Sequence, residues 1–146
     1  MAVSIRKITL WRTEVEHRPG ALAELLEPLA AAGADLQTVM GYRIPGQKAR
    51  AVIEVAPVSN RKVARAAESR GLAPGHAPTL LVLGDNRPGL ATRIARALSE
   101  SGVNIAFLVA QVVGRRYSAV FGFENEADLD KASDRVRAAV TSRARR

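Results

Sequence analysis

Two stretches of this chain repeat one another at a constant spacing. Residues 17–23, His-Arg-Pro-Gly-Ala-Leu-Ala, resemble residues 86–92, Asn-Arg-Pro-Gly-Leu-Ala-Thr, and Pro19 and Pro88 are 69 positions apart. The same spacing places residues 33–36 on residues 102–105 without a gap, so turn and strand signals agree across a whole helix length. A repeat of this kind predicts two copies of one structural unit.

Each copy begins with a strand, a turn and a helix. Apolar strands are expected at residues 8–15 and 79–83, and each runs into the Arg-Pro-Gly turn. Proline suits a first helical position because its φ is preset and no N–H is wasted, so a helix should follow each turn. Gly33 and Gly102 should end these helices, since glycine reaches a left-handed conformation without a Cβ clash. Pro28 lies inside the first helix and is expected to bend it or end it early.

A hairpin and a second helix complete each copy. The expected strands are residues 36–44 and 49–55 in the first copy and residues 103–113 and 117–123 in the second. Ser59 and Asn125 are the expected N-caps of the closing helices, and Gly71 is expected to end the earlier one.

This order, strand-helix-strand-strand-helix, is the ferredoxin-like arrangement without its last strand. We therefore predict an α+β protein of two ferredoxin-like units packed together, with the first at residues 1–72, a linker at 73–77 and the second at 78–146. An unfinished sheet exposes unpaired backbone groups at its edge, and proteins usually cover such edges by pairing. The hypothesis is that the two copies share strands, or that two chains do so and form a homodimer.

The residues around the second turn resemble a known family. Residues 85–90, Asp-Asn-Arg-Pro-Gly-Leu, and residues 101–106, Ser-Gly-Val-Asn-Ile-Ala, resemble the ACT domain at the end of bacterial D-3-phosphoglycerate dehydrogenases, where serine is the effector. The resemblance implies a tandem ACT protein without a fused enzyme, which binds an amino acid, regulates a partner and is not itself an enzyme. It implies no cofactor and no metal. Asparagines of these relatives contact the effector at the positions of Asn86 and Asn104, whereas a histidine that the relatives commonly have is Gly84 here.

The residues support a ligand site on physical grounds as well. A free amino acid carries a carboxylate and an ammonium, and the opening of a helix offers N–H groups and a positive dipole end to the carboxylate. Asn86 and Asn104 can each donate and accept hydrogen bonds. The candidate ligand-binding residues of the second copy are Asp85, Asn86, Arg87, Pro88, Gly89, Leu90, Asn104 and Ile105. The 69-residue spacing adds His17 and Asp35 as their counterparts in the first copy, so the ligand need not be serine.

Composition leaves one alternative function open. The formal net charge of +8 suits a nucleic-acid-binding protein, and ferredoxin-like sheets also bind RNA. The arginines are spread along the chain, however, and the aromatic pattern of RNA-recognition modules is missing. Cysteine is absent, and the nucleotide-binding and hydrolase motifs are not found, which disfavours an enzyme. The start of the chain does not resemble a signal peptide, so we expect a cytoplasmic protein.

Overall fold

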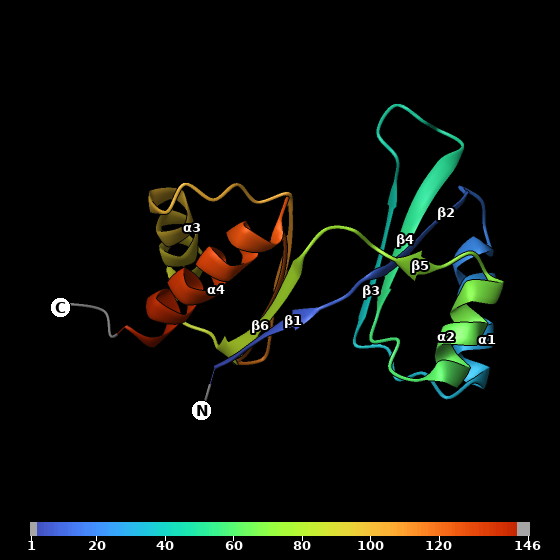
Figure 1. The fold of residues 1–146 in the computed structure, drawn as a ribbon, viewed down its shortest axis with the longest axis horizontal. Coiled ribbons are helices and arrows are strands. Elements are labelled where there is room, and N and C mark those ends of the chain that lie inside the picture. Colours follow the sequence, from blue (N-terminus) through green and yellow to red (C-terminus); the bar gives the residue numbers. More distant parts are fainter. Residues whose placement is uncertain (1–2, 143–146) are drawn as a thin grey trace. The chain divides into compact units, whose positions relative to one another are not determined.

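The computed structural model describes residues 3–142, and the chain divides into two compact units (Figure 1). The first unit is Thr9–His76, and the second unit combines the residues up to Ile8 with those from Ala77 onward. Each unit has two helices on one face of a four-stranded antiparallel sheet, which is the predicted α+β, ferredoxin-like architecture. None of the helices among the described residues is long and apolar enough to cross a membrane.

The second unit contains most of the predicted elements in the predicted order. They are β6 (Thr79–Asp85), α3 (Leu90–Glu100), β7 (Phe107–Val113), β8 (Arg116–Gly122) and α4 (Glu126–Thr141). Its sheet has the order β1-β6-β8-β7, where β1 is Ser4–Ile8. The first residues of the chain thus supply the fourth strand of this sheet.

The first unit repeats this arrangement with a shorter last strand. Its elements are β2 (Trp11–Glu16), α1 (Ala21–Ala31), β3 (Thr38–Arg43), β4 (Arg50–Ala56), α2 (Arg61–Ser69) and β5 (Ala73–Pro74). The sheet order is β3-β4-β2-β5, so the two residues of β5 cover the edge of β2. Proline is tolerated there because an edge strand has a side on which no N–H is needed.

The strand expected at residues 8–15 corresponds to β2, Trp11–Glu16, whereas Ile8 ends a separate strand, β1. The two strands belong to different sheets: β1 pairs with β6, and β2 pairs with β4. Pairing along β1 from Ser4↔Leu83 to Ile8↔Thr79 covers the edge of β6, and the partly buried side chains of Val3 and Ile5 join the core of the second unit. Sharing of strands within the chain accounts for the edge that the sequence left unfinished.

The Arg-Pro-Gly segments form turns that precede the helices. Leu90 N donates to Arg87 O at 3.3 Å, and Gly89 has φ 79° and ψ 0°, which are the values of the third residue of a type II turn. Proline at the second position and glycine at the third suit this turn. Pro88 was expected to be the first helical residue and instead lies before the N-cap, Gly89. The first copy has the same turn, with Gly20 at φ 88°.

Most of the remaining end signals are confirmed. Gly33, Gly71 and Gly102 all have positive φ just beyond a helix. Asn125 caps α4 by accepting from Asp128 N at 2.8 Å, whereas the N-cap of α2 is Asn60, one residue after the expected Ser59. Of the two effects expected of Pro28, bending or early termination, early termination is wrong, because α1 continues to Ala31.

Each unit has its own apolar core. In the second unit, buried side chains of α3 and α4, such as Leu98 and Val136, pack against the inward face of β6 and β8. Leu80 and Phe121 are buried on that face. Strand β7 contributes little to that core, because it lies at the edge of the sheet and Leu108–Val113 are exposed.

Candidate functional site

The predicted site of the second unit lies where β6 gives way to α3. Asp85 is the last residue of β6, and its carboxylate lies 3.5 Å from the Arg116 guanidinium. Asn86 is exposed, and its backbone N–H donates to Arg115 O at 2.8 Å. This bond holds the Asn86 backbone against the β7–β8 hairpin, so its side chain lies beside the opening of α3.

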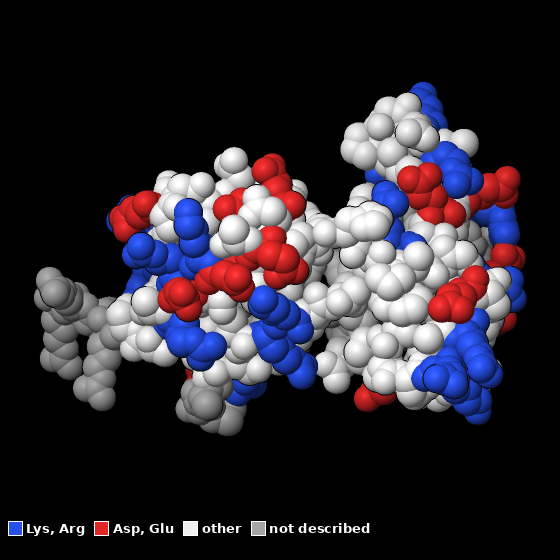
Figure 2. Space-filling view, in the orientation of Figure 1, with Lys and Arg blue, Asp and Glu red and all other residues white. Residues whose placement is uncertain are grey.

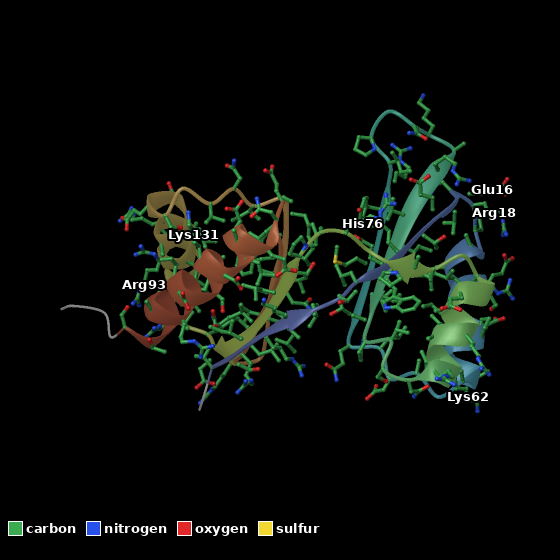
Figure 3. The ribbon with its side chains drawn as sticks, in the orientation of Figure 1. Glu16, Arg18, Lys62, His76, Arg93 and Lys131 are labelled. Carbon is green, nitrogen blue, oxygen red and sulfur yellow. The ribbon has the colours of Figure 1, made fainter. Side chains whose placement is uncertain are left out.

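Two arginines at this end of the unit bind the end of α4. Arg87 donates to Val140 O at 2.7 Å and to Ser142 O at 3.2 Å. Arg93, which is labelled in Figure 3, donates to Ser142 O at 2.7 Å. The last turn of α4 has no basic residue of its own. The two guanidinium groups therefore compensate the negative end of the α4 dipole and place positive charge near the opening of α3.

Asn104 does not join Asn86 within one unit. β6 and β7 both pair antiparallel with β8, so they run parallel to each other. Asn86 follows Asp85, which pairs with Arg116, whereas Asn104 precedes Phe107, which pairs with Gly122. Arg116 and Gly122 are the two ends of β8, about 20 Å apart at 3.3 Å per residue. The idea of one helix opening flanked by both carboxamides is thus wrong for a single unit.

A groove beside Asn86 extends along the sheet from this end of the unit. It has a volume of about 330 Å³ and lies between α3 and the inward faces of β7 and β8. Its lining is mainly apolar and consists of Asn86, Leu90, Ala91, Ile94, Ala95, Ile105, Leu108, Ala110, Gln111, Val112, Tyr117, Ala119 and Phe121. Three of the predicted site residues, Asn86, Leu90 and Ile105, line it. Asn104 does not.

Tyr117 lies at the Asn86 end of the groove and was not predicted as a site residue. Its residue is only 7% exposed, and its hydroxyl has no hydrogen-bond partner among the described residues. Burial raises the pKa of this hydroxyl above its ordinary value, against the opposing effect of the Arg87 and Arg116 guanidinium groups.

The Tyr117 ring lies over Gly84, its partner across β6 and β8. A Cβ at Gly84 would lie 2.9 Å from the Tyr117 hydroxyl oxygen, so the absence of a side chain there makes room for the ring. Gly84 is the sequence signal that could have identified Tyr117, because glycine inside a strand often marks close approach by another group.

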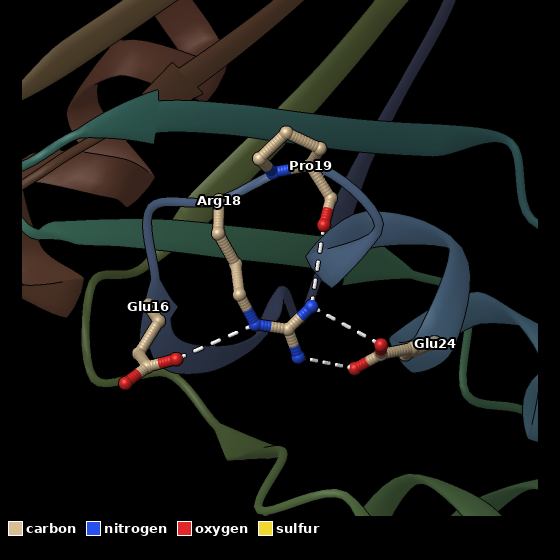
Figure 4. A network of polar contacts seen from close by, with 4 residues as sticks. All are labelled: Glu16, Arg18, Pro19 and Glu24. Carbon is tan, nitrogen blue, oxygen red and sulfur yellow. Dashed lines mark hydrogen bonds and ion pairs between the residues drawn. The ribbon is translucent and has the colours of Figure 1, made fainter.

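The equivalent turn of the first unit is occupied by the protein's own ion pairs (Figure 4). The Arg18 guanidinium lies between two carboxylates, at 2.5 Å from Glu24 and 3.4 Å from Glu16, and it also donates to Pro19 O. Hydrogen bonds from Arg18 hold the pKa of the Glu24 carboxyl below its ordinary value. Glu24 lies in the first turn of α1, where an incoming carboxylate would otherwise bind.

The first-copy candidates His17 and Asp35 are both exposed and also lie at opposite ends of their unit. The His17 N–H donates to Ala49 O at 2.8 Å, next to the β3–β4 hairpin. Asp35 precedes Gln37, whose N–H donates to Ala56 O at the other end of β4.

Charged side chains of both signs are interspersed on the surface. Figure 2 shows Lys and Arg next to Asp and Glu on the visible face of each unit. Lys7 is one example, since its ammonium lies 3.3 Å from Glu126 and 3.1 Å from Asp130. This distribution gives the nucleic-acid alternative no specific support.

Comparison with known proteins relates residues 78–140 to one family and most of the chain to solved structures of the same fold. Residues 78–140 match the ACT domain family. Among solved structures, the protein BT0572 from Bacteroides thetaiotaomicron is similar with a TM-score of 0.73 and 19% identity, over 91% of this chain and 88% of that one. No curated protein sequence matches the chain.

Two further similar structures are regulatory subunits of aspartate kinase. The subunit from Thermus thermophilus has a TM-score of 0.64 and 16% identity, over 95% of this chain and 97% of that one. The subunit from Thermus flavus has a TM-score of 0.59 and 15% identity, over 96% and 97%. At these identities the likeness concerns the fold.

Proposed function

Starting from an ACT domain at residues 78–140, we propose that this chain is an amino-acid-binding regulatory protein without chemistry of its own. The proposed ligand site is the strand-to-helix turn of the second unit. The fold it shares with regulatory subunits of aspartate kinase, over nearly the full length of both chains, supports a role in regulating an enzyme.

The observation that carries this proposal is the contrast between the two helix openings. The first turn of α3 contains no acidic residue, whereas the first turn of α1 contains Glu24, which is bound to Arg18. At the position of Glu24, the second copy has Arg93. An opening with a positive dipole end and nearby guanidinium groups favours the carboxylate of a free amino acid, and the opening beside Glu24 repels it.

We therefore expect one ligand per chain, bound beside Asn86. A ligand can regulate only by binding one arrangement of the protein more tightly than another. A site formed by the β6–α3 turn and the β7–β8 hairpin connects several elements of the unit, so its occupancy would favour the arrangement in which those elements are closest.

Thermal unfolding in the presence of each of the twenty amino acids tests the proposal. A ligand at 100 times its Kd stabilises the folded protein by about 2.7 kcal/mol, which is easily seen as a rise in Tm. Asn86→Ala should reduce this rise. The matched control is His17→Ala, at the same position of the first copy, which should leave it unchanged. If no amino acid raises the Tm, or if RNA raises it instead, the proposal is wrong.

We also infer that the chain forms a homodimer through β7. This strand lies at the edge of its sheet, and four of its large apolar side chains are between 45% and 71% exposed: Leu108, Val109, Val112 and Val113. An exposed apolar edge is a template for pairing with another strand, and a second β7 offers the same unpaired backbone groups. Val109→Lys, whose side chain lies on the sheet face away from the helices, should convert a dimer to a monomer in sedimentation equilibrium. A wild-type monomer at high concentration would contradict this inference.

A further inference from the structure

We infer that the groove between α3 and β7 binds the side chain of the ligand, and that the ligand is an amino acid with a large apolar side chain, such as leucine, isoleucine, methionine or phenylalanine. The inference rests on the proposed function, because it assigns the ligand class of the same site. It also assigns Tyr117 as a ligand-binding residue.

The shape and lining of the groove favour this class. Its polar groups are those of Asn86, Gln111 and Tyr117, and its other lining residues are apolar. Its volume of about 330 Å³ is near the lower limit for small-molecule sites, which suits one amino acid better than a nucleotide. A polar side chain in this groove would lose its water without gaining hydrogen bonds, whereas an apolar one gains from leaving water.

The Tyr117 hydroxyl is an independent sign of a ligand. A buried hydroxyl normally has a hydrogen-bond partner, and this one has none among residues 3–142. Tyr117 pairs across the sheet with Gly84, two residues before Asn86, so its hydroxyl lies at the polar end of the groove. A ligand whose carboxylate or ammonium binds at Asn86 would bring a polar atom to this hydroxyl as well.

Comparison of the two copies shows that the groove depends on small residues. Ala91 and Ala95 line its α3 side together with Leu90 and Ile94. The 69-residue spacing places Leu22 and Leu26 of the first copy at the positions of the two alanines. Leu26 packs against the core of its own unit. At the position of Ala95 the first copy therefore has a leucine that packs against its core, whereas Leu22, at the position of Ala91, is 45% exposed.

Filling the groove is the first test. Ala95→Leu introduces the residue that the first copy has, at an exposed helix position where leucine is nearly as favourable as alanine. We expect it to weaken binding of leucine or phenylalanine roughly 10-fold or more, measured by titration calorimetry, because overpacked sites exclude extra atoms. Thr92→Leu, on α3 but outside the groove, is the matched control and should bind like the wild type.

Removing the hydroxyl is the second test. Tyr117→Phe should weaken ligand binding about 3- to 10-fold, the usual effect of losing one hydrogen bond. The same substitution should leave the Tm of the ligand-free protein unchanged or raise it, since a buried hydroxyl without a partner is unfavourable. A residue with only a structural role would lower the ligand-free Tm and leave the affinity unchanged.

The outcomes separate this inference from the function on which it rests. Binding of apolar amino acids that is weakened by Ala95→Leu and by Tyr117→Phe supports both. Binding of serine, aspartate or lysine that depends on Asn86 but not on Ala95 or Tyr117 retains the proposed function and overturns the assignment of the groove. Absence of binding by any amino acid overturns both.

Discussion

The contact between Gly84 and Tyr117 allows one substitution to be predicted in detail. In Gly84→Ala, the new Cβ would lie 2.9 Å from both Cε1 and the hydroxyl oxygen of Tyr117, and 3.0 Å from Cζ. Favourable contacts between carbon atoms need about 3.5–4.0 Å, so the ring must move. Gly84 lies within β6 and does not have a positive φ, so backbone strain is not part of the effect.

The net effect follows from two opposing contributions. Overpacking a buried position typically costs about 1–3 kcal/mol. Replacing glycine by alanine restricts the unfolded chain and stabilises by about 0.4–1 kcal/mol where the conformation is compatible. We expect Gly84→Ala to lower the free energy of unfolding of the second unit by about 1–2 kcal/mol.

Native-state hydrogen exchange of the β8 amides measures that free energy for the second unit by itself. In a Tyr117→Leu background the contacting ring atoms are gone, so Gly84→Ala should become neutral or stabilising. Gly41→Ala, in β3 of the first unit and followed through exchange of the β4 amides, is the control, since the nearest atom to a Cβ there is Val52 O at 4.0 Å. Equal destabilisation by Gly84→Ala in both backgrounds would refute the role of the Tyr117 contact.

Three further predictions concern the rest of the chain. Asn125→Ala should destabilise α4 by about 1 kcal/mol through loss of the N-cap bond, whereas Asn125→Asp should retain the cap, as measured by denaturant unfolding. Arg18→Met should raise the pKa of Glu24 toward its ordinary value in an NMR titration. With Arg18 present, the ion pair stabilises the folded protein at pH values above the ordinary carboxyl pKa, and this stabilisation is lost as the pH falls through the lower pKa of the folded state. Ile5→Asp should destabilise the second unit by about 1–3 kcal/mol, as measured by hydrogen exchange of the β6 amides, because Ile5 packs against its core. Ser4→Asp is the control and should change this exchange little, because Ser4 is exposed.

Much of the fold was predictable because its signals are local. The left-handed exits at Gly33 and Gly102 and the cap at Asn125 depend on the conformation of a few adjacent residues. The turn before each helix was predicted correctly, but its proline was assigned to the first helical position, since proline is favourable both there and at the second position of a type II turn.

The candidate site was only partly predictable. Asn86 and Ile105 line the groove, but Asn104 lies at the other end of the sheet from Asn86. A residue that follows one strand and a residue that precedes the next parallel strand lie at opposite ends of a sheet. The topology therefore separates Asn86 from Asn104, although the sequence motif suggested that they lie close together. Tyr117 was missed because its role depends on the cross-strand pairing with Gly84.

The sequence by itself determined most of the helices and strands in their order, and it places Glu24 at one helix opening and Arg93 at the other. Only the tertiary structure decided that Ser4–Ile8 completes the sheet of the second unit, and that a groove with a buried Tyr117 hydroxyl lies beside Asn86. The physical reason is the distance along the chain between the residues that interact. Turns and caps form between neighbours in the chain, whereas strand pairing and cavities depend on the packing of residues that are far apart in it.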